Sequence, residues 1–535
     1  MPVSPTYPGV YIDELPSAVR TIVGVPTSIA AFVGWAPRGP ADPVHITNFD
    51  DYTQTFGGLH EQSPMSHAVY QFYLNGGSEA EIVRLVGASA AATIQLLPAP
   101  AGNPPAGGGP KLKAASGGSW GNKLRVRVDY DTKDPSDTKL YNLTIRDAGI
   151  GAQETYLNVS IDQSNPRYLA NVLSGSRLVV LDGDATTRPN AHAAVTAGLD
   201  PFADGKVGDP PGGWYSEPPA GSGTDSAAMA QADYVGDNST TGLYQLRKTD
   251  IFNMLCLPGL LGVAEGTAGA NTVQDAALQL CVERRAMLIV DPPDEWKTVN
   301  DAADPNRAHH LKGDSTKNAA IYFPNVRVGN PLHGGAVEKF PPCGVVAGIW
   351  ARTDVQRGVW KAPAGTAASL NGVAALGHDV PLKITDLQNG ILNPLGINCL
   401  RSFPVVGPVS WGARTMRGAD RLADQWKYLP VRRLALFIEE SLYRGTQWVV
   451  FEPNDEPLWS SIRLNVGAFM NNLFRQGAFQ GRTPQQAYLV KCDSTNNPQN
   501  DIDRGIVNIL IGFAPLKPAE FVIIHIQQLA GQIQV

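Results

Sequence analysis

The sequence predicts a multidomain α/β (α+β) protein, with a mixed-sheet core and helices, an inserted β-rich domain, and extended strand arms at both ends. The chain has 535 residues, which is too long for one ordinary core. Helix and strand patterns alternate in its first ninety residues and return after residue 250, which is typical of α/β folds. Between them lies a run of alternating strands flanked by Pro/Gly-rich stretches, which favours a separate β domain.

These patterns predict six consecutive parts. In chain order they are an N-terminal arm (1–20), a first part of the core (21–88), an inserted β-rich outer domain (89–240), a second part of the core (241–400), a C-terminal domain (401–519) and a C-terminal strand arm (520–535). We expect the inserted domain on the outer surface, because an insertion must leave the parent core intact.

The first part of the core reads as strand, helix, strand. The apolar run at 29–33 is bounded by Pro26 and Gly34 and predicts a buried strand. Residues 65–75 carry apolar side chains at helical spacing, and two glycines end that pattern. A second apolar run at 81–86 predicts another strand.

The inserted part contains four runs with strand character. They are Leu124–Tyr130, Leu140–Ile145, Thr155–Ile161 and Arg177–Leu181. The stretches 98–121 and 201–226 are rich in Pro, Gly and small residues and read as linkers.

The α/β rhythm then resumes and continues to the end of the chain. In its first half we expect strands over Ile251–Leu257, Ala286–Val290 and Ala319–Phe323, and helices over Val273–Arg284 and Cys343–Ala351. In its second half we expect helices over Val431–Leu442 and from Pro457 to about Gln476, and strands over Trp448–Phe451, Tyr488–Lys491 and Ile506–Phe513.

Both ends of the chain carry strand-forming runs that invite pairing. The stretch 521–535 contains no Lys, Arg, Asp or Glu, and an uncharged strand edge is a template for another chain. Near the start, the strand-like run Val10–Ile12 is flanked by prolines on both sides. The residues expected to pair between subunits are Val10, Tyr11, Ile12, Phe521, Val522, Ile523, Ile524 and Ile526. The alternative is that the last run completes a sheet of its own domain.

Bulk composition excludes several classes of function. The net charge is -6, and no dense Lys/Arg stripe is present, so nucleic acid is not an expected partner. The five cysteines are scattered and lie mostly in apolar runs, which favours buried thiols in a reducing compartment. We find neither a signal peptide pattern nor an apolar stretch of the ~18 residues that a membrane span requires. We therefore expect a protein made in the cytoplasm without membrane insertion.

The chemical motifs in the chain are weak. Ser119 stands in a G-x-S-x-G match at 117–121, but a Gly-rich linker precedes it where a nucleophile needs a strand. Asp291 and Asp294 follow an expected strand, and a rigid turn explains them more simply than catalysis. The adjacent histidines His309 and His310 have no Cys or carboxylate near them at metal-ligand spacing. We expect no catalytic residue, cofactor or metal.

Five stretches resemble contractile tail sheath proteins. They are Tyr7–Glu14, Gly24–Ser28 leading into Ala31–Gly34, Gly39–Pro40, Phe451–Trp459 and Gly512–Phe521. They cover roughly the first ninety and the last hundred residues, while the inserted domain is not matched.

This resemblance implies a sheath subunit that forms stacked hexameric rings around an inner tube. The implied partners are further copies of the chain in a helical polymer, the inner tube protein, and the baseplate and tail terminator or cap proteins. In the family, both arms reach into neighbouring subunits and complete their sheets. The assembled product would be a phage tail or an injection-system particle.

The resemblance also implies that a helix near 458–476 touches the tube. Leu464, Phe469, Leu473 and Phe474 are the expected buried side of this helix, which leaves Arg463 and Arg475 for the tube-facing side. An ordinary surface helix with solvated arginines is the simpler alternative.

Two other classes of protein remain as rivals. One is a soluble α/β hydrolase with a β-rich accessory domain, which would use Ser119 or Asp291. The other is a non-contracting tube or capsid protein, which would also polymerise but into a single lattice.

Overall fold

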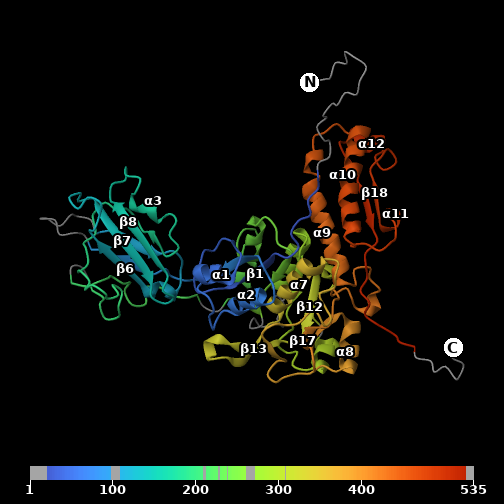
Figure 1. Ribbon diagram of the computed structural model, residues 1–535, viewed down its shortest axis with the longest axis horizontal. Coiled ribbons are helices and arrows are strands. Elements are labelled where there is room, and N and C mark those ends of the chain that lie inside the picture. The colour runs from blue at the N-terminus through green and yellow to red at the C-terminus, as the bar shows by residue number, and fades with distance from the viewer. Residues whose placement is uncertain are drawn as a thin grey trace, which may run out of the picture.

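The computed structural model describes residues 21–97, 109–208, 212–226, 229–237, 239–260, 272–307 and 309–525. The expected N-terminal pairing residues and Ile526 lie outside the described residues. Figure 1 shows three bodies: a β-rich body at one end of the long axis, a mixed body beside it, and a helical body that stands above the side of the mixed body away from the β-rich one.

The middle body is built on an eight-stranded sheet with the order β17-β16-β12-β11-β10-β1-β3-β2. Its strands are β1 (Ala30–Trp35), β2 (Val44–Ile46), β3 (Ala80–Leu85), β10 (Met254–Cys256), β11 (Met287–Val290), β12 (Ala319–Phe323), β16 (Ile397–Phe403) and β17 (Gly407–Ser410). All neighbours pair in parallel except the two edge strands, β2 and β17. The sheet thus extends past residue 400, where the sequence predicted the end of the core.

Helices cover both faces of this sheet, because its central strands are apolar on both sides. One face packs on α2 (Pro64–Leu74) and α7 (Cys343–Arg357), and α1 (Phe49–Phe56) lies beside α2. The opposite face packs on α5 (Thr272–Glu283) and on the short helices α4 (Gln231–Val235), α6 (Val299–Ala303) and α8 (Asp386–Leu392). In β1, Phe32 points to the first layer and Val33 to the second. A small antiparallel sheet adjoins this body, formed by β13 (Val326–Asn330), β14 (Ala336–Phe340) and β15 (Val373–Leu376).

The β-rich body is the insertion between β3 and β10 and has its own apolar core. Its elements are β4 (Thr93–Gln95), β5 (Lys111–Ala114), β6 (Leu124–Asp129), β7 (Leu140–Asp147), β8 (Gln153–Ser160), α3 (Leu169–Leu173) and β9 (Val179–Leu181). They form two three-stranded sheets, β4-β5-β9 and β6-β7-β8. At the root of the insertion, Arg38 of the middle body forms a buried ion pair of 2.9 Å with Asp147. This contact fixes the insertion to the middle body.

The helical body follows β17. Its elements are α9 (Leu429–Gly445), α10 (Glu456–Arg475), α11 (Pro484–Ala487), β18 (Tyr488–Lys491), α12 (Gln499–Asp503) and β19 (Leu510–Phe513). β18 and β19 form a separate two-stranded antiparallel sheet, whose inner side packs with α9 and α10 in one apolar cluster. No helix in the described part of the chain is long and apolar enough to cross a membrane.

Helix α9 belongs to two cores at once. Leu436 packs into the core of the middle body, whereas Leu434 and Ile438 pack into the core of the helical body. The side chain of Arg433 donates two hydrogen bonds to Asp354 of α7, at 2.9 and 2.6 Å. Both side chains are almost completely buried. Helix α9 and this buried ion pair therefore help to join the two bodies.

The α/β multidomain prediction is confirmed, and three local predictions are wrong. Residues 98–121 were expected to form a linker, but they contain β5, the central strand of the β4-β5-β9 sheet, and the start of a 3-10 helix at Ser119. The expected strand over 448–451 is a 3-10 helix at Gln447–Val449 followed by a turn. Leu464 was expected to be buried in α10, but it is 53% exposed. The buried side of α10 follows Ile462, Val466, Phe469 and Leu473, and Leu464 lies on the other side of this stripe.

The Asp354→Asn variant tests the join between the two bodies. It leaves the Arg433 guanidinium buried without its counter-ion, so we expect the free energy of unfolding to fall by about 3–5 kcal/mol. The control is Asp182→Asn, which removes an exposed ion pair with Lys111 and should cost less than about 1 kcal/mol. Urea denaturation followed by circular dichroism measures both. Equal losses in the two variants would contradict the structural role of the buried pair.

Candidate self-assembly site

The C-terminal segment presents an unpaired apolar surface. Phe521, Val522, Ile523 and Ile524 are 73, 79, 79 and 78% exposed, and residues 521–525 form no secondary structure with the rest of the chain. Figure 1 shows the trace after β19 descending beside the middle body and then leaving it. Folded proteins rarely leave four consecutive large apolar residues in water, so this segment is a candidate for pairing with another molecule.

The β18–β19 sheet is a candidate acceptor for such a strand. Tyr488 pairs with Phe513, and Val490 pairs with Ile511; these four side chains face the helices of the apolar cluster. Among the described residues no third strand joins either edge. Two-stranded sheets are marginal on their own, and an added strand would extend the backbone hydrogen bonding of this one.

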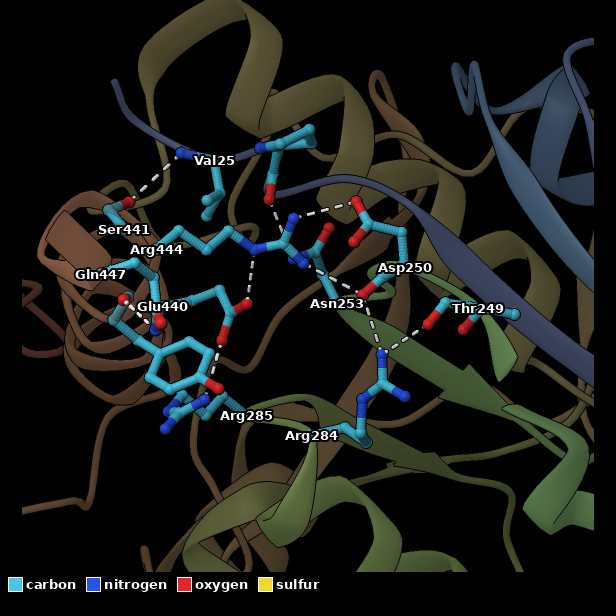
Figure 2. Close-up of polar contacts among 12 residues, drawn as sticks. Val25, Thr249, Asp250, Asn253, Arg284, Arg285, Glu440, Ser441, Arg444 and Gln447 are labelled. Carbon is cyan, nitrogen blue, oxygen red and sulfur yellow. Dashed lines mark hydrogen bonds and ion pairs between the residues drawn. The ribbon is translucent and has the colours of Figure 1, made fainter. Parts of the chain in front are cut away.

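A polar network fixes the helical body relative to the middle body (Figure 2). Arg444 of α9 lies at its centre and donates to the carboxylate of Glu440 at 2.7 Å and to the carboxylate of Asp250 at 2.9 Å. Arg285, which precedes β11, donates to the other oxygen of Glu440 at 2.9 Å. The pair with Asp250 is exposed, and an exposed pair contributes at most about 1 kcal/mol, whereas the two pairs of Glu440 are partly buried. The network therefore orients α9, while the buried Arg433–Asp354 pair contributes more of the stability.

The turn after α9 exposes an aromatic side chain that the sequence analysis missed. Phe451 is 101% exposed and has a φ of 70°, in the left-handed region that bulky residues avoid. Strained and exposed residues cluster at functional sites. The only signal in the sequence was the position of Phe451 at the start of the stretch 451–459 that resembles sheath proteins, where it had been taken for a strand residue.

The two arginines expected to face a tube differ in their surroundings. Arg463 is half-buried and donates to Glu456 at 2.6 Å and to the backbone carbonyl of Cys492. These contacts tie its charge to its own domain. Arg475 is exposed at the end of α10 and remains available to a partner.

The two residues that a hydrolase would use, Ser119 and Asp291, both lie in surroundings that support the fold. Ser119 opens a short 3-10 helix, Ser119–Lys123, that runs directly into β6, so the α-helix that a nucleophile turn requires does not follow it. Asp291 follows β11 and accepts a hydrogen bond of 2.8 Å from the backbone N–H of Cys343 at the start of α7. No group of three or more metal-ligating side chains occurs in the described ranges.

Comparison with known proteins gives three kinds of match. Residues 423–528 match the phage tail sheath C-terminal domain. A tail sheath protein of Vibrio phage KVP40 is 26% identical over 336 residues, which are 58% of this chain and 47% of that protein. A putative prophage major tail sheath protein of Pseudomonas aeruginosa is 24% identical over 49% of this chain and 63% of its own length. The chain thus spans about half to two thirds of these relatives.

Solved structures match over nearly the whole chain. The sheath of an extracellular contractile injection system (PVC) in its contracted state covers 99% of both chains, with 20% identity and a TM-score of 0.55. The contracted helical sheath of the anti-feeding prophage covers 98% of this chain and 100% of its own, with 21% identity and a TM-score of 0.57. The chain has the fold of a contractile tail sheath protein.

A tail sheath protein from Listeria innocua, with a TM-score of 0.59 at 14% identity, covers 93% of this chain and 96% of its own. The resemblance seen in the sequence is therefore confirmed. The two-stranded sheet, α10 and the start of the exposed segment all fall within the matched sheath domain, at 423–528.

The ionisation of Asp291 gives a pH-dependent prediction. Burial raises the pKa of its carboxyl to about 7, and the hydrogen bond from Cys343 opposes this shift only partly. The folded state therefore holds this proton more tightly than the unfolded state, so this contribution to stability is present at about pH 4 and is lost as the pH rises through 7.

The Asp291→Asn variant keeps an oxygen acceptor for Cys343 but cannot ionise. We expect it to be more stable than the parent by about 1–3 kcal/mol at pH 8.5, and to lose this advantage near pH 4. Melting temperatures at the two pH values measure the effect. A difference that does not change with pH would show that Asp291 ionises as freely in the folded chain as in the unfolded one.

Proposed function

We propose that this chain is the structural sheath subunit of a contractile tail or injection system. It polymerises into stacked hexameric rings around an inner tube and contracts to drive the tube through a target envelope. The observation that carries the proposal is the exposed run Phe521–Ile524, which pairs with no strand among the described residues and extends away from a body with the sheath fold.

Each subunit lends its ends to adjacent copies. The segment after Glu520 adds a strand to a β18–β19 sheet of a neighbour, and the N-terminal arm around Val10, Tyr11 and Ile12 makes a second link. Each backbone hydrogen bond in such a pairing contributes about 0.5–1.5 kcal/mol net, and the bonds of one strand act together. The exposed apolar side chains add a contribution that rises with the area they bury.

Contraction requires rigid bodies joined by links that do not break. The shared helix α9, the buried Arg433–Asp354 pair and the network around Arg444 make the middle and helical bodies one unit. The strand links let such units change their packing without separating. A lattice that buries more surface per subunit when contracted would supply the driving free energy.

Other components of the particle complete the list of proposed partners. A chain of the anti-feeding prophage baseplate shares this fold, with a TM-score of 0.55 and 20% identity, which supports contact with a baseplate. The inner tube lies against the exposed side of α10, where Arg475 is the available cation. A tail terminator or cap protein closes the polymer. The subunit is made in the cytoplasm and is built into a phage tail or an injection particle.

The rivals make different predictions. A hydrolase would be a monomer or small oligomer and would lose activity with Ser119→Ala. A non-contracting tube or capsid protein would form one lattice, whereas a sheath forms two helical lattices of different diameter. Negative-stain electron microscopy of the purified protein distinguishes all three.

Deletion of residues 521–535 should abolish tubes and leave a folded subunit. The reason is that the deletion removes the lent strand, whose described residues 521–525 are all exposed. Size-exclusion chromatography and electron microscopy measure assembly, and circular dichroism measures folding. The control is Leu387→Ser, which removes an apolar side chain that is equally exposed but lies on α8 of the middle body. Normal tubes from the truncated chain would refute strand lending.

The Arg475→Glu variant tests the tube-facing side of α10. The charge reversal should weaken co-assembly with the inner tube protein, and added salt should weaken the parent contact, because an exposed charge contact is screened. Co-sedimentation at low and high salt measures both effects. The control is Lys517→Glu, which makes the same charge change outside α10. Unchanged binding by Arg475→Glu would show that α10 is an ordinary surface helix with solvated arginines.

A further inference from the structure

The C-terminal segment is attached to the molecule at two separate places. At the first, Ala514 donates to the backbone carbonyl of Ala487 at 2.8 Å and accepts from the backbone N–H of Gln480 at 2.9 Å, so the segment still belongs to the helical body. At the second, the carboxylate of Glu520 accepts two hydrogen bonds from Arg414, at 2.8 and 2.6 Å. Arg414 belongs to the middle body, just after β17.

Between these two places the segment spans a groove and packs loosely. A cavity of about 640 Å³ lies beneath it, lined by both bodies and by residues 516–521. Leu516 and Lys517 are exposed. The ion pair is therefore the principal attachment of the segment to the middle body.

Hydrogen bonds within the middle body hold Arg414 in position to bind that carboxylate. Its side chain is 0% exposed, and its guanidinium also donates to the carbonyls of Asn393 and Gly418 and to the carboxylate of Asp420. Its backbone is also fixed, because its N–H donates to the side-chain oxygen of Asn398 in β16 and its carbonyl accepts from the side-chain nitrogen of Asn398. The side-chain amide of Asn398 also donates to the backbone carbonyl of Ile321 in β12, so Arg414 is linked to the central sheet.

Directly after Glu520 come the exposed residues that pair with a neighbour in the proposed function. Tension on a lent strand would otherwise reach the end of β19, whose four residues would separate from β18 one pair at a time. A buried charge pair with two parallel hydrogen bonds resists such a pull better than the end of a short strand does.

We infer that the Arg414–Glu520 ion pair is the mechanical anchor of the C-terminal segment. It transfers tension from the lent strand to the eight-stranded sheet and so protects the β18–β19 sheet from being pulled apart. This inference rests on the proposed function for its purpose, while the anchor itself can be measured on a single subunit.

The test variant is Glu520→Gln. It removes the charge and keeps the shape, and Asp420 still balances the buried Arg414, so the body should fold with an unchanged melting temperature. The control is Lys517→Gln, which removes a charge from the same segment three positions earlier. Glu520→Ala serves as a second variant that also removes the hydrogen-bond acceptor.

Optical tweezers can pull one subunit between a tag after Val535 and a thiol handle on the core. Val355→Cys on α7 provides the handle, because Val355 is exposed and the natural cysteines are buried. In the parent we expect a first step that frees residues 514–520, with a gain of up to about 25 Å, followed by the loss of β19. Glu520→Gln should shorten the lifetime of the first step at constant force about tenfold or more, because a charge-assisted bidentate contact is lost. Lys517→Gln should not change it.

The same variants then test the role of the anchor in the polymer. Sheaths of Glu520→Gln should assemble, since residues 521–535 are intact, but should shed more subunits on contraction than the parent. Equal step lifetimes in Glu520→Gln and the parent would overturn the anchor, whatever the sheaths do. A variant sheath that contracts without extra loss would overturn its mechanical role. A parent that forms no sheath would refute the proposed function and leave the pulling result standing.

Discussion

The structure depends on helix α9 being shared between two hydrophobic cores. Leu436 packs into the middle body and Leu434 into the helical body, and the buried Arg433–Asp354 pair lies between them. Removing one partner of such a pair costs several times more free energy than removing an exposed ion pair. For this reason the two bodies move together, and the position of the β18–β19 sheet relative to the central sheet is fixed.

A rigid subunit can work in a contractile polymer only if the links between subunits are flexible. The segment after Glu520 provides that contrast: it is exposed, apolar and without a backbone partner in the described chain. Strand pairing suits such a link, since many modest hydrogen bonds act along one strand and none depends on a single side chain. The ion pair at Arg414 marks the boundary between the rigid body and the link.

Local patterns in the sequence predicted much of this fold. The apolar run at 29–33 became β1, whereas the pairing of the run at 521–524 with a neighbouring subunit stays a prediction. Patterns of adjacent residues were less reliable where the chain direction changes: the apolar run at 448–451 forms the end of a 3-10 helix and a turn, in which Phe451 adopts a positive φ. Leu464 was misplaced because its apolar character was given more weight than its angular position on α10.

The contacts between distant residues could not be predicted in this way. Asp354 and Arg433 are 79 positions apart, and Arg414 and Glu520 are 106 positions apart. No periodicity connects such pairs, and each charge alone reads as an ordinary surface residue. Only the packing of the bodies shows that Arg414 is buried and that Glu520 closes on it.

The most direct test is a cryo-electron microscopy map of tubes assembled from the purified chain. We expect backbone density to cross between protomers, with residues 521–524 of one copy paired as a strand with β18 or β19 of the next. A map in which this segment folds back onto its own body, with no backbone hydrogen bonds between protomers, would contradict the idea that each copy lends a strand to its neighbour.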